Sequence, residues 1–310
     1  MKTIKIFAYA LAVTSGFVFT SCGSDDSGSN DLPPIGGYES ADEVGAADLI
    51  AYFPLNGDGK EMRSGAMPRT TVGATWVEGK KGQAVKLNAG YLDYDPITDL
   101  NVQSGNITVS CWAKITNTKL TPDAASTISP LVSFSGGTSV VGNLSIFGNT
   151  HGLVSSDSIE MKAQYFFKKP DGEGFGGDCV NLLKLSQGHI DENNASQTDI
   201  DHAAFPNKIG GQWAHIVFTW EGSSGTARLY VNGVKISNPK WEIRNGGNPM
   251  PMAFFTPTRP TIGALASFVA GTTDAWNAPL KGEIDEIRVW KKTLPLNDIN
   301  ALYQLESAGR

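Results

Sequence analysis

Residues 213–236, WAHIVFTWEGSSGTARLYVNGVKI, decide the fold of this chain. Every second position from 214 to 220 is apolar: Ala214, Ile216, Phe218 and Trp220. Such alternation is typical of a β-strand that buries one face. A second apolar run ends at Asn232-Gly233, the preferred two-residue hairpin turn, because both positions need positive φ. The stretch therefore predicts an antiparallel β-hairpin.

The same alternation recurs on both sides of this hairpin. Further strands are expected over residues 49–55, 72–77, 83–92, 107–115, 131–134, 143–147, 159–167 and 282–290. A short helix with an apolar stripe is expected over 295–304, and the longest loop over 170–211. With 35 Gly and 16 Pro in 310 residues, long helices are disfavoured. The pattern predicts an all-β sandwich of two antiparallel sheets with a short C-terminal helix.

The first 21 residues have the features of an export signal. Lys2 and Lys5 precede an apolar run, residues 6–18, that is too short to span a bilayer. The following Phe19-Thr20-Ser21-Cys22 resembles a bacterial lipobox, which implies cleavage before Cys22 and its lipidation. The alternative is an ordinary secretory signal whose cysteine is incidental.

The segment after Cys22 is polar and acidic, so residues 22–45 are expected to form a flexible tether. It resembles the export signal of surface-exposed lipoproteins in Gram-negative bacteria that harvest polysaccharides. We therefore expect an outer-membrane protein, anchored by lipid alone and exposed at the cell surface, with one folded domain over residues 46–310.

The charge balance and the cysteines limit the remaining possibilities. The chain carries 25 basic against 31 acidic side chains and no basic cluster, so a nucleic-acid partner is not expected. Outside the cytoplasm a disulfide between Cys111 and Cys179 is permitted. Nothing in the sequence brings the two together, and we expect two buried thiols instead.

Several segments, in order, resemble the laminin-G-like branch of the concanavalin A-like lectin/glucanase superfamily. They are LIAYFPLNGD (49–58), GKKGQA (79–84), ITVSCW (107–112), QWAHIVFT (212–219), RLYVNG (228–233) and GEIDEIRVW (282–290). The resemblance covers about residues 49–306 and implies a jelly roll of two packed antiparallel sheets. This chain departs from shorter members by long insertions between about 117 and 210.

The resemblance also raises the question of catalysis, because the superfamily includes retaining glucanases. Those enzymes need two carboxylates about 5–5.5 Å apart, supplied in laminarinase-type members by Glu-x-Asp-x-(x)-Glu. Glu283 and Asp285 begin this pattern, but Ile287 and Arg288 occupy both possible positions of the second glutamate. We therefore expect no enzyme activity.

Asp285 is the candidate metal ligand. By strand parity it shares a face with Ile287 and Val289, so its carboxylate needs a cation or several backbone N–H donors. If the first and last strands pair, Asp285 approaches Asn56 and Asp58, whose oxygens suit calcium. Relatives often hold a structural calcium, and the resemblance implies one such ion here. The alternative, that Asp285 only accepts amide hydrogen bonds, stays open.

Sugar binding by such folds uses exposed aromatic faces flanked by polar side chains. Trp241 and Trp276 lie in polar loops, beside Asn245 and Asn277 respectively, and are the candidate glycan contacts. We expect a non-catalytic, surface-anchored binding module for a glycan or polysaccharide. The alternative is an adhesin, or a structural subunit of a surface assembly, that binds other surface proteins.

Overall fold

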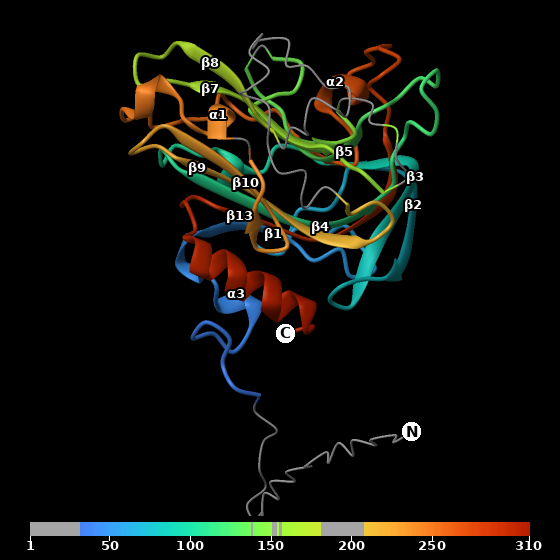
Figure 1. The fold of residues 1–310 in the computed structure, drawn as a ribbon, viewed down its shortest axis with the longest axis horizontal. Helices are drawn as coiled ribbons and strands as arrows, with labels where there is room; N and C mark the ends of the chain where they lie inside the picture. Colours follow the sequence, from blue (N-terminus) through green and yellow to red (C-terminus); the bar gives the residue numbers. More distant parts are fainter. Residues whose placement is uncertain (1–31, 138, 151–153, 155–156, 181–207, 238) are drawn as a thin grey trace, which may run out of the picture. The chain divides into compact units, whose positions relative to one another are not determined.

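The computed structural model describes residues 32–310 except 138, 151–153, 155–156, 181–207 and 238. The chain divides into two units, residues 1–33 and residues 34–310. The predicted signal peptide and Cys22 lie outside the described residues. The second unit is an antiparallel β-structure with few helices (Figure 1).

Thirteen strands in the described residues form one sheet in the order β11-β10-β9-β4-β13-β3-β12-β5-β6-β7-β8, with β1 paired to β13 and β2 to β3. The strands are β1 (Leu49–Phe53), β2 (Thr70–Glu78), β3 (Gln83–Asp93), β4 (Ile107–Ile115), β5 (Ser129–Phe134), β6 (Leu144–Gly148), β7 (Met161–Lys168), β8 (Gly174–Val180), β9 (Trp213–Glu221), β10 (Thr226–Val231), β11 (Val234–Lys235), β12 (Pro260–Ile262) and β13 (Leu280–Trp290). The helices are α1 (Pro239–Glu242), α2 (Ala266–Val269) and α3 (Leu296–Ser307).

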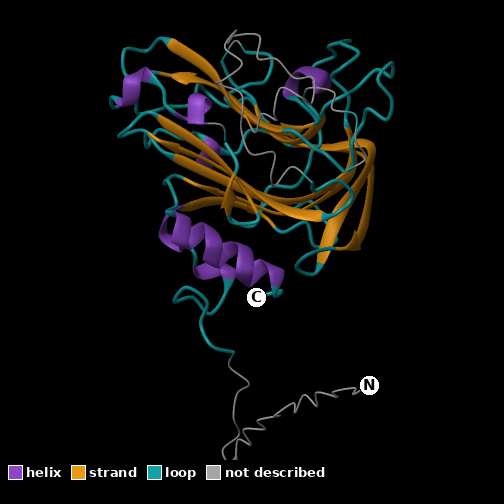
Figure 2. Ribbon diagram, viewed as in Figure 1, coloured by secondary structure: helices purple, strands orange, loops and turns teal. Residues whose placement is uncertain are grey.

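The sheet curls back on itself and gives two packed layers (Figure 2). The first layer contains β1, β4, β9, β10 and β13, the second contains β5, β6, β7, β8 and β12, and β3 pairs with strands of both. The predicted all-β jelly roll is confirmed, with the detail that its two layers are joined through β3. The first and last strands pair as expected, with Phe53 opposite Ile287.

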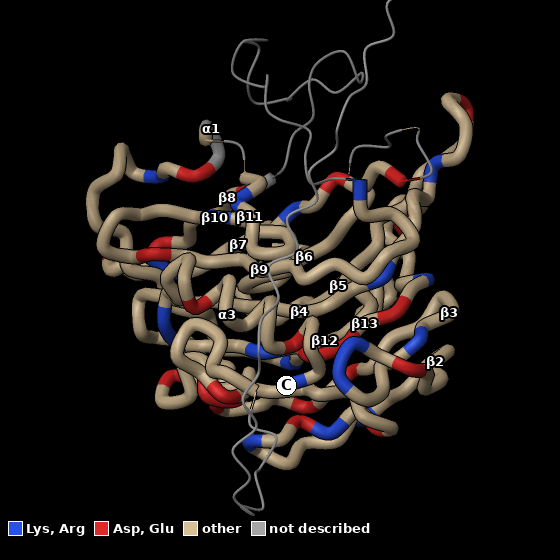
Figure 3. The backbone as a smooth tube through the Cα atoms, turned by 60° about the horizontal axis from the view of Figure 1, so that its bottom comes forward, with Lys and Arg blue, Asp and Glu red and all other residues tan. Residues whose placement is uncertain are grey.

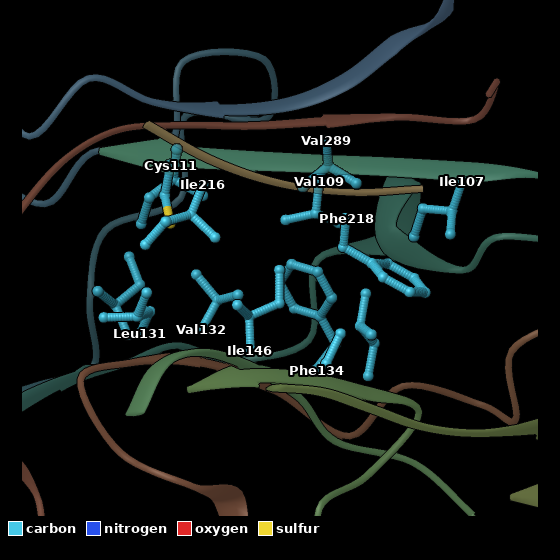
Figure 4. Close-up of a cluster of buried hydrophobic side chains, with 14 of the residues drawn as sticks. Ile107, Val109, Cys111, Leu131, Val132, Phe134, Ile146, Ile216, Phe218 and Val289 are labelled. Carbon is cyan, nitrogen blue, oxygen red and sulfur yellow. The ribbon is translucent and has the colours of Figure 1, made fainter. Parts of the chain in front are cut away.

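The core fills the space between the layers (Figure 4). From the first layer, Val109 and Cys111 of β4 and Phe218 of β9 point toward Val132 and Ile146 of the second layer. These first-layer positions are the apolar faces that the sequence alternation predicts, because successive side chains on a strand point to opposite sides.

Both described cysteines and the hairpin turn agree with the predictions. Cys111 and Cys179 are free thiols, fully buried in the core. Asn232 and Gly233 adopt φ of 51° and 76° between β10 and β11, which is the conformation that the Asn-Gly pair favours.

The region of the predicted insertions builds the second layer. Strands β5 to β8 all lie between residues 129 and 180, inside the 117–210 segment. The prediction of a loop from residue 170 was wrong at β8, whose sequence GFGGDCV resembles a turn. Its glycines are required because the ring of Phe166 on β7 lies against Gly174 and Gly176, where a Cβ would contact it at 2.5 and 3.3 Å.

Helix α3 lies against the outer side of the first layer (Figure 1). Its apolar stripe packs onto Val217, Tyr230 and Trp290 of the sheet. Residues 34–45, expected to belong to the tether, also pack here: Ala41 and Val44 are buried with this helix. The folded unit thus begins before residue 46. Within the described residues, no helix is both long and apolar enough to cross a membrane.

Candidate functional site

The outer face of the first layer holds a buried ionic network under α3. Arg288 of β13 contacts Glu286 at 2.8 Å, Glu306 of α3 at 2.9 Å and Asp42 at 2.8 Å. Arg288, Glu286 and Glu306 are 0–1% exposed. Burial raises the pKa of the Glu306 carboxyl, although Arg288 beside it acts in the opposite direction. Because Arg288, Glu286 and Glu306 are buried beneath α3, they join helix to sheet and are closed to a ligand. The face that they occupy is called the covered face below.

His215 of β9 lies in the same network. Its ring packs against Trp112 and Tyr303 at centroid distances of 5.2 and 6.1 Å, and these two rings also contact each other at 5.7 Å. The Nε2 of His215 lies 3.6 Å from a Glu306 oxygen. Neither ring nitrogen has a hydrogen-bond partner in the described part of the chain. Burial, with Arg288 nearby, lowers the pKa of His215 to about 3, so the imidazole is neutral in the folded protein.

Asp285 accepts backbone hydrogen bonds at the edge of this layer. Its carboxylate receives the N–H groups of Lys80 at 2.7 Å, Lys81 at 3.1 Å and Glu286 at 2.9 Å. Burial raises the pKa of Asp285 to about 7, and the amide bonds act against this shift. These are the contacts that the alternative to calcium described. The bonds to Lys80 and Lys81 fix the turn over residues 79–82 against Asp285. Asn56 also stabilises this turn by accepting the N–H of Gln83.

The calcium ligand set does not fit a cation well in this arrangement. The carboxylate of Asp285 faces backbone N–H donors, whereas a calcium ion needs oxygen ligands around it. The side chains of Asn56 and Asp58 each already accept a backbone N–H. In the residues that the structure describes, no group of three or more His, Cys, Asp or Glu side chains is arranged to hold a metal ion. We therefore derive no role for a metal here, and calcium stays a prediction.

The parity prediction for β13 was wrong. Ile284, Ile287 and Val289 face the core, so Asp285 does not share their face. The reason is a β-bulge between Asp285 and Arg288, where Glu286 has φ of 47° and the register shifts. Glu283 in turn forms ion pairs with Lys86 and Lys114 at 3.7 and 3.3 Å.

The outer face of the second layer, which we call the open face, contains a cleft of about 460 Å³ among the described residues. The cleft crosses the glycine pair Gly176-Gly177 of the edge strand β8, and we call it the β8 cleft. Its polar lining includes Gln164 and Asp178, which lie opposite each other on β7 and β8, and Arg244 from the segment after α1. Arg244 donates to the Tyr165 hydroxyl at 2.8 Å and to the Asp178 carbonyl.

A smaller pocket of about 230 Å³ adjoins the β8 cleft. It is lined by the glycine-rich loop after β5, by Arg259 and by residues of α2, and we call it the glycine-loop pocket. Ser139 lines both cavities. Phe166, a half-buried side chain of the β8 cleft, stacks on Phe255 at 5.3 Å with 10° between the rings. A Cβ on Gly137 of the glycine-loop pocket would lie within 3.0 Å of both rings, so this aromatic pair joins the two cavities.

Asn143 holds the parts of this groove together. Its side chain, fully buried, accepts the N–H of Phe255 at 2.8 Å and donates to the carbonyls of Phe255 and Ser135 at 3.1 and 3.2 Å. Gly136 permits this approach, because a Cβ there would overlap the amide of Asn143. The amide thus fixes the glycine-rich loop against the segment that carries the aromatic ring.

None of the four predicted sugar contacts belongs to the described lining of either cavity. Asn245 follows Arg244 directly and is exposed. Asn277 is buried and donates to Ser267, which lines the glycine-loop pocket. Trp276 is 42% exposed and lies beside this groove only in sequence, next to Asn277. Trp241 belongs to α1, and its side chain lies outside the described residues.

A third cavity, of about 440 Å³, lies where β4, β5 and β13 begin or end. Its lining includes Thr116, Thr127, Ser129 and Lys281, and among its described lining residues none is aromatic. Trp276 reaches its border through a backbone bond to Ile128. The open face of the second layer is therefore the better candidate, because it combines rings with amide, carboxylate and guanidinium groups.

Comparison with known proteins finds a family model that matches part of the chain. Residues 154–300 match the model of the concanavalin A-like lectin/glucanases superfamily, of laminin G type. A pentraxin fusion protein from Xenopus laevis is 25% identical over 114 residues, which cover 35% of this chain and 24% of that protein. The predicted resemblance to laminin-G-like jelly rolls is confirmed over the matched residues.

Solved structures share this architecture at low sequence identity. The binding domain of botulinum neurotoxin serotype G matches with a TM-score of 0.52 and 12% identity, over 84% of this chain and 52% of that one. Domain 4 of AbnA, an arabinanase of Geobacillus stearothermophilus solved with arabinotriose, matches with a TM-score of 0.47 and 19% identity. The match covers 83% of this chain and 98% of that domain. This chain thus spans about half of the toxin domain and a quarter of the pentraxin fusion protein.

Proposed function

We propose that this chain is a non-catalytic carbohydrate-binding module whose glycan lies along the open face of the second layer. The observation that carries the proposal is the stacked pair of Phe166 and Phe255, half-buried between two polar cavities. A pyranose ring has an apolar C–H face and a rim of hydroxyl groups. Phe166 suits the C–H face, while Gln164 and Asp178 suit the hydroxyl groups.

The glucanase-type carboxylates give no support to catalysis. Glu283 and Asp285 are engaged by lysine side chains and backbone amides, and both lie away from the open-face groove on β13. The groove itself contributes one carboxylate, Asp178, among its described lining, whereas a retaining glycosidase uses two.

The surface-anchored arrangement is part of the same proposal. Residues 34–45 enter the domain beside α3, on the outer side of the first layer. The strands β7 and β8, whose residues line the groove, belong to the other layer (Figure 1). A domain tethered through its N-terminal segment, with the lipid on Cys22, would present the groove on the side away from its point of attachment.

The test is a binding screen of the purified protein against plant, algal and host glycans. Phe166→Ala is expected to weaken binding of any hit by roughly tenfold or more, because it removes one stacking surface. Trp276→Ala is the matched control, an exposed aromatic outside the groove. Equal affinity of Phe166→Ala and the parent protein would place the ligand elsewhere. A folded protein without any glycan hit would favour the alternative, a protein partner.

A further inference from the structure

The glycine-loop pocket has a charge that the proposed function does not use. Arg259 is the one charged residue of its described lining, and no carboxylate lines it. The remaining lining is small or carries hydroxyl groups, including Ser139, Thr258 and Ser267. A cavity with a guanidinium and several hydroxyl donors is suited to an anionic group.

Arg259 is fixed in place and remains accessible. Its backbone N–H donates to the Ser135 hydroxyl at 2.7 Å, and its carbonyl accepts the N–H of Ser135 at 3.1 Å. The side chain is 25% exposed. Its ion pair with Asp93, at 3.2 Å, uses one of five N–H donors, and the same Asp93 oxygen lies closer to Arg69, at 2.6 Å. The guanidinium therefore keeps donors for a ligand.

The rest of the groove does not oppose negative charge. Asp178, the carboxylate of the β8 cleft, is paired with Lys162 at 2.9 Å. Arg244 lines the far end of that cleft, and the ammonium of Lys168 lies 6.0 Å from the Phe255 ring between the two cavities. Along the described backbone basic and acidic residues are interspersed (Figure 3), and the whole chain has a net charge of −6. The groove, whose one described carboxylate is paired with a lysine, differs from this average.

From this arrangement we infer that the groove takes an acidic oligosaccharide of at least two sugar units. The carboxylate or sulfate of one unit occupies the glycine-loop pocket against Arg259, while the neighbouring ring stacks on Phe166. The shared Ser139 and the aromatic pair make the two cavities consecutive positions for one chain. This inference rests on the proposed function and names the class of its ligand.

The experiment compares acidic tetrasaccharides with neutral counterparts of the same linkage. The probes are tetragalacturonate and tetramannuronate before and after carboxyl reduction, and a sulfated galactan tetrasaccharide before and after desulfation. At least one acidic member is expected to bind tenfold or more tightly than its neutral form, and far more tightly than its monosaccharide. Raising the salt from 50 to 300 mM is expected to weaken this binding, because screening acts on the charged contact.

Three variants assign the preference to Arg259. Arg259→Gln is expected to abolish the preference for acidic over neutral tetrasaccharides, and Arg259→Lys is expected to keep most of this preference. Lys292→Gln, which removes the same charge beside the first layer, is the control and is expected to leave the preference unchanged. Neutral forms that bind as well as acidic ones, or a preference that survives Arg259→Gln, would overturn the inference while leaving the module a glycan binder. Because the reduced and desulfated probes act on the parent protein, the inference stays falsifiable even if Arg259→Gln is unstable.

Discussion

The covered face of the first layer and the open face of the second both place aromatic rings next to charged side chains. On the covered face, Trp112 donates to Glu306 at 2.7 Å, and Arg288 binds the buried carboxylates of Glu286 and Glu306. On the open face, Phe166 and Arg259 are only partly buried and line cavities. The difference teaches that residue type alone does not mark a binding face, because a single helix converts one of them into an interior.

The largest loss of stability is expected from substitution of Arg288 on the covered face. Arg288→Ala is expected to lower the free energy of unfolding by about 3–5 kcal/mol, because it leaves Glu286 and Glu306 buried without their cation. Urea unfolding measures this loss. Arg228→Ala is the control, since its pair with Glu221 is exposed and worth about 1 kcal/mol or less. A loss at Arg288 no larger than at Arg228 would mean that the network contributes little to holding α3.

A pH-dependent effect is expected at His215. Above its ordinary pKa of 6.5 the imidazole is neutral in both states. As the pH falls below 6.5, His215 binds a proton in the unfolded chain, whereas in the folded protein it binds one only near pH 3. Protonation therefore favours the unfolded chain, and the free energy of unfolding falls. The loss reaches roughly 3 kcal/mol at pH 4.5.

The measurement for His215 is the difference in Tm between the parent protein and His215→Phe from pH 7.5 to 4.5. Taking the difference removes the contributions of carboxyl groups that do not contact His215. Phenylalanine retains the ring contacts with Trp112 and Tyr303. The variant is expected to gain relative stability as the pH falls, and parallel curves would show that folding does not lower the pKa of His215.

Much of the fold was predictable because the alternation of apolar residues is a local signal. Strand β4 was predicted with its observed ends, and the Asn232-Gly233 turn with its conformation. The bulge at Glu286 was not predictable, because no glycine marks its positive φ. Strand β8 was missed because its glycines leave room for the ring of Phe166 on the neighbouring strand and give no alternation of apolar and polar residues.

The candidate site was harder to predict than the fold. Its residues come from six separate segments, around Ser139, Phe166, Asp178, Arg244, Arg259 and Ser267, so no local motif contains them. One signal was present: Phe166 occupies a position that parity assigns to the outer face, between Gln164 and Lys168. An aromatic residue among outward polar ones is a better guide to this face than tryptophans in loops. Asn143 gave no signal, because its role depends on two distant loops.

The smallest effect is expected from metal removal. Since the carboxylate of Asp285 already accepts three backbone N–H groups, EDTA is expected to change the Tm by less than about 1 °C, whereas Asp285→Ala should cost roughly 1–3 kcal/mol by leaving those donors unpaired. Calorimetric scans with calcium and with EDTA measure the first quantity. A Tm that rises with calcium, and no longer does so in Asp285→Ala, would restore the predicted site with Asn56 and Asp58. Without such a shift, Asp285 belongs with Arg288 and His215 to the buried polar groups that hold the covered side together.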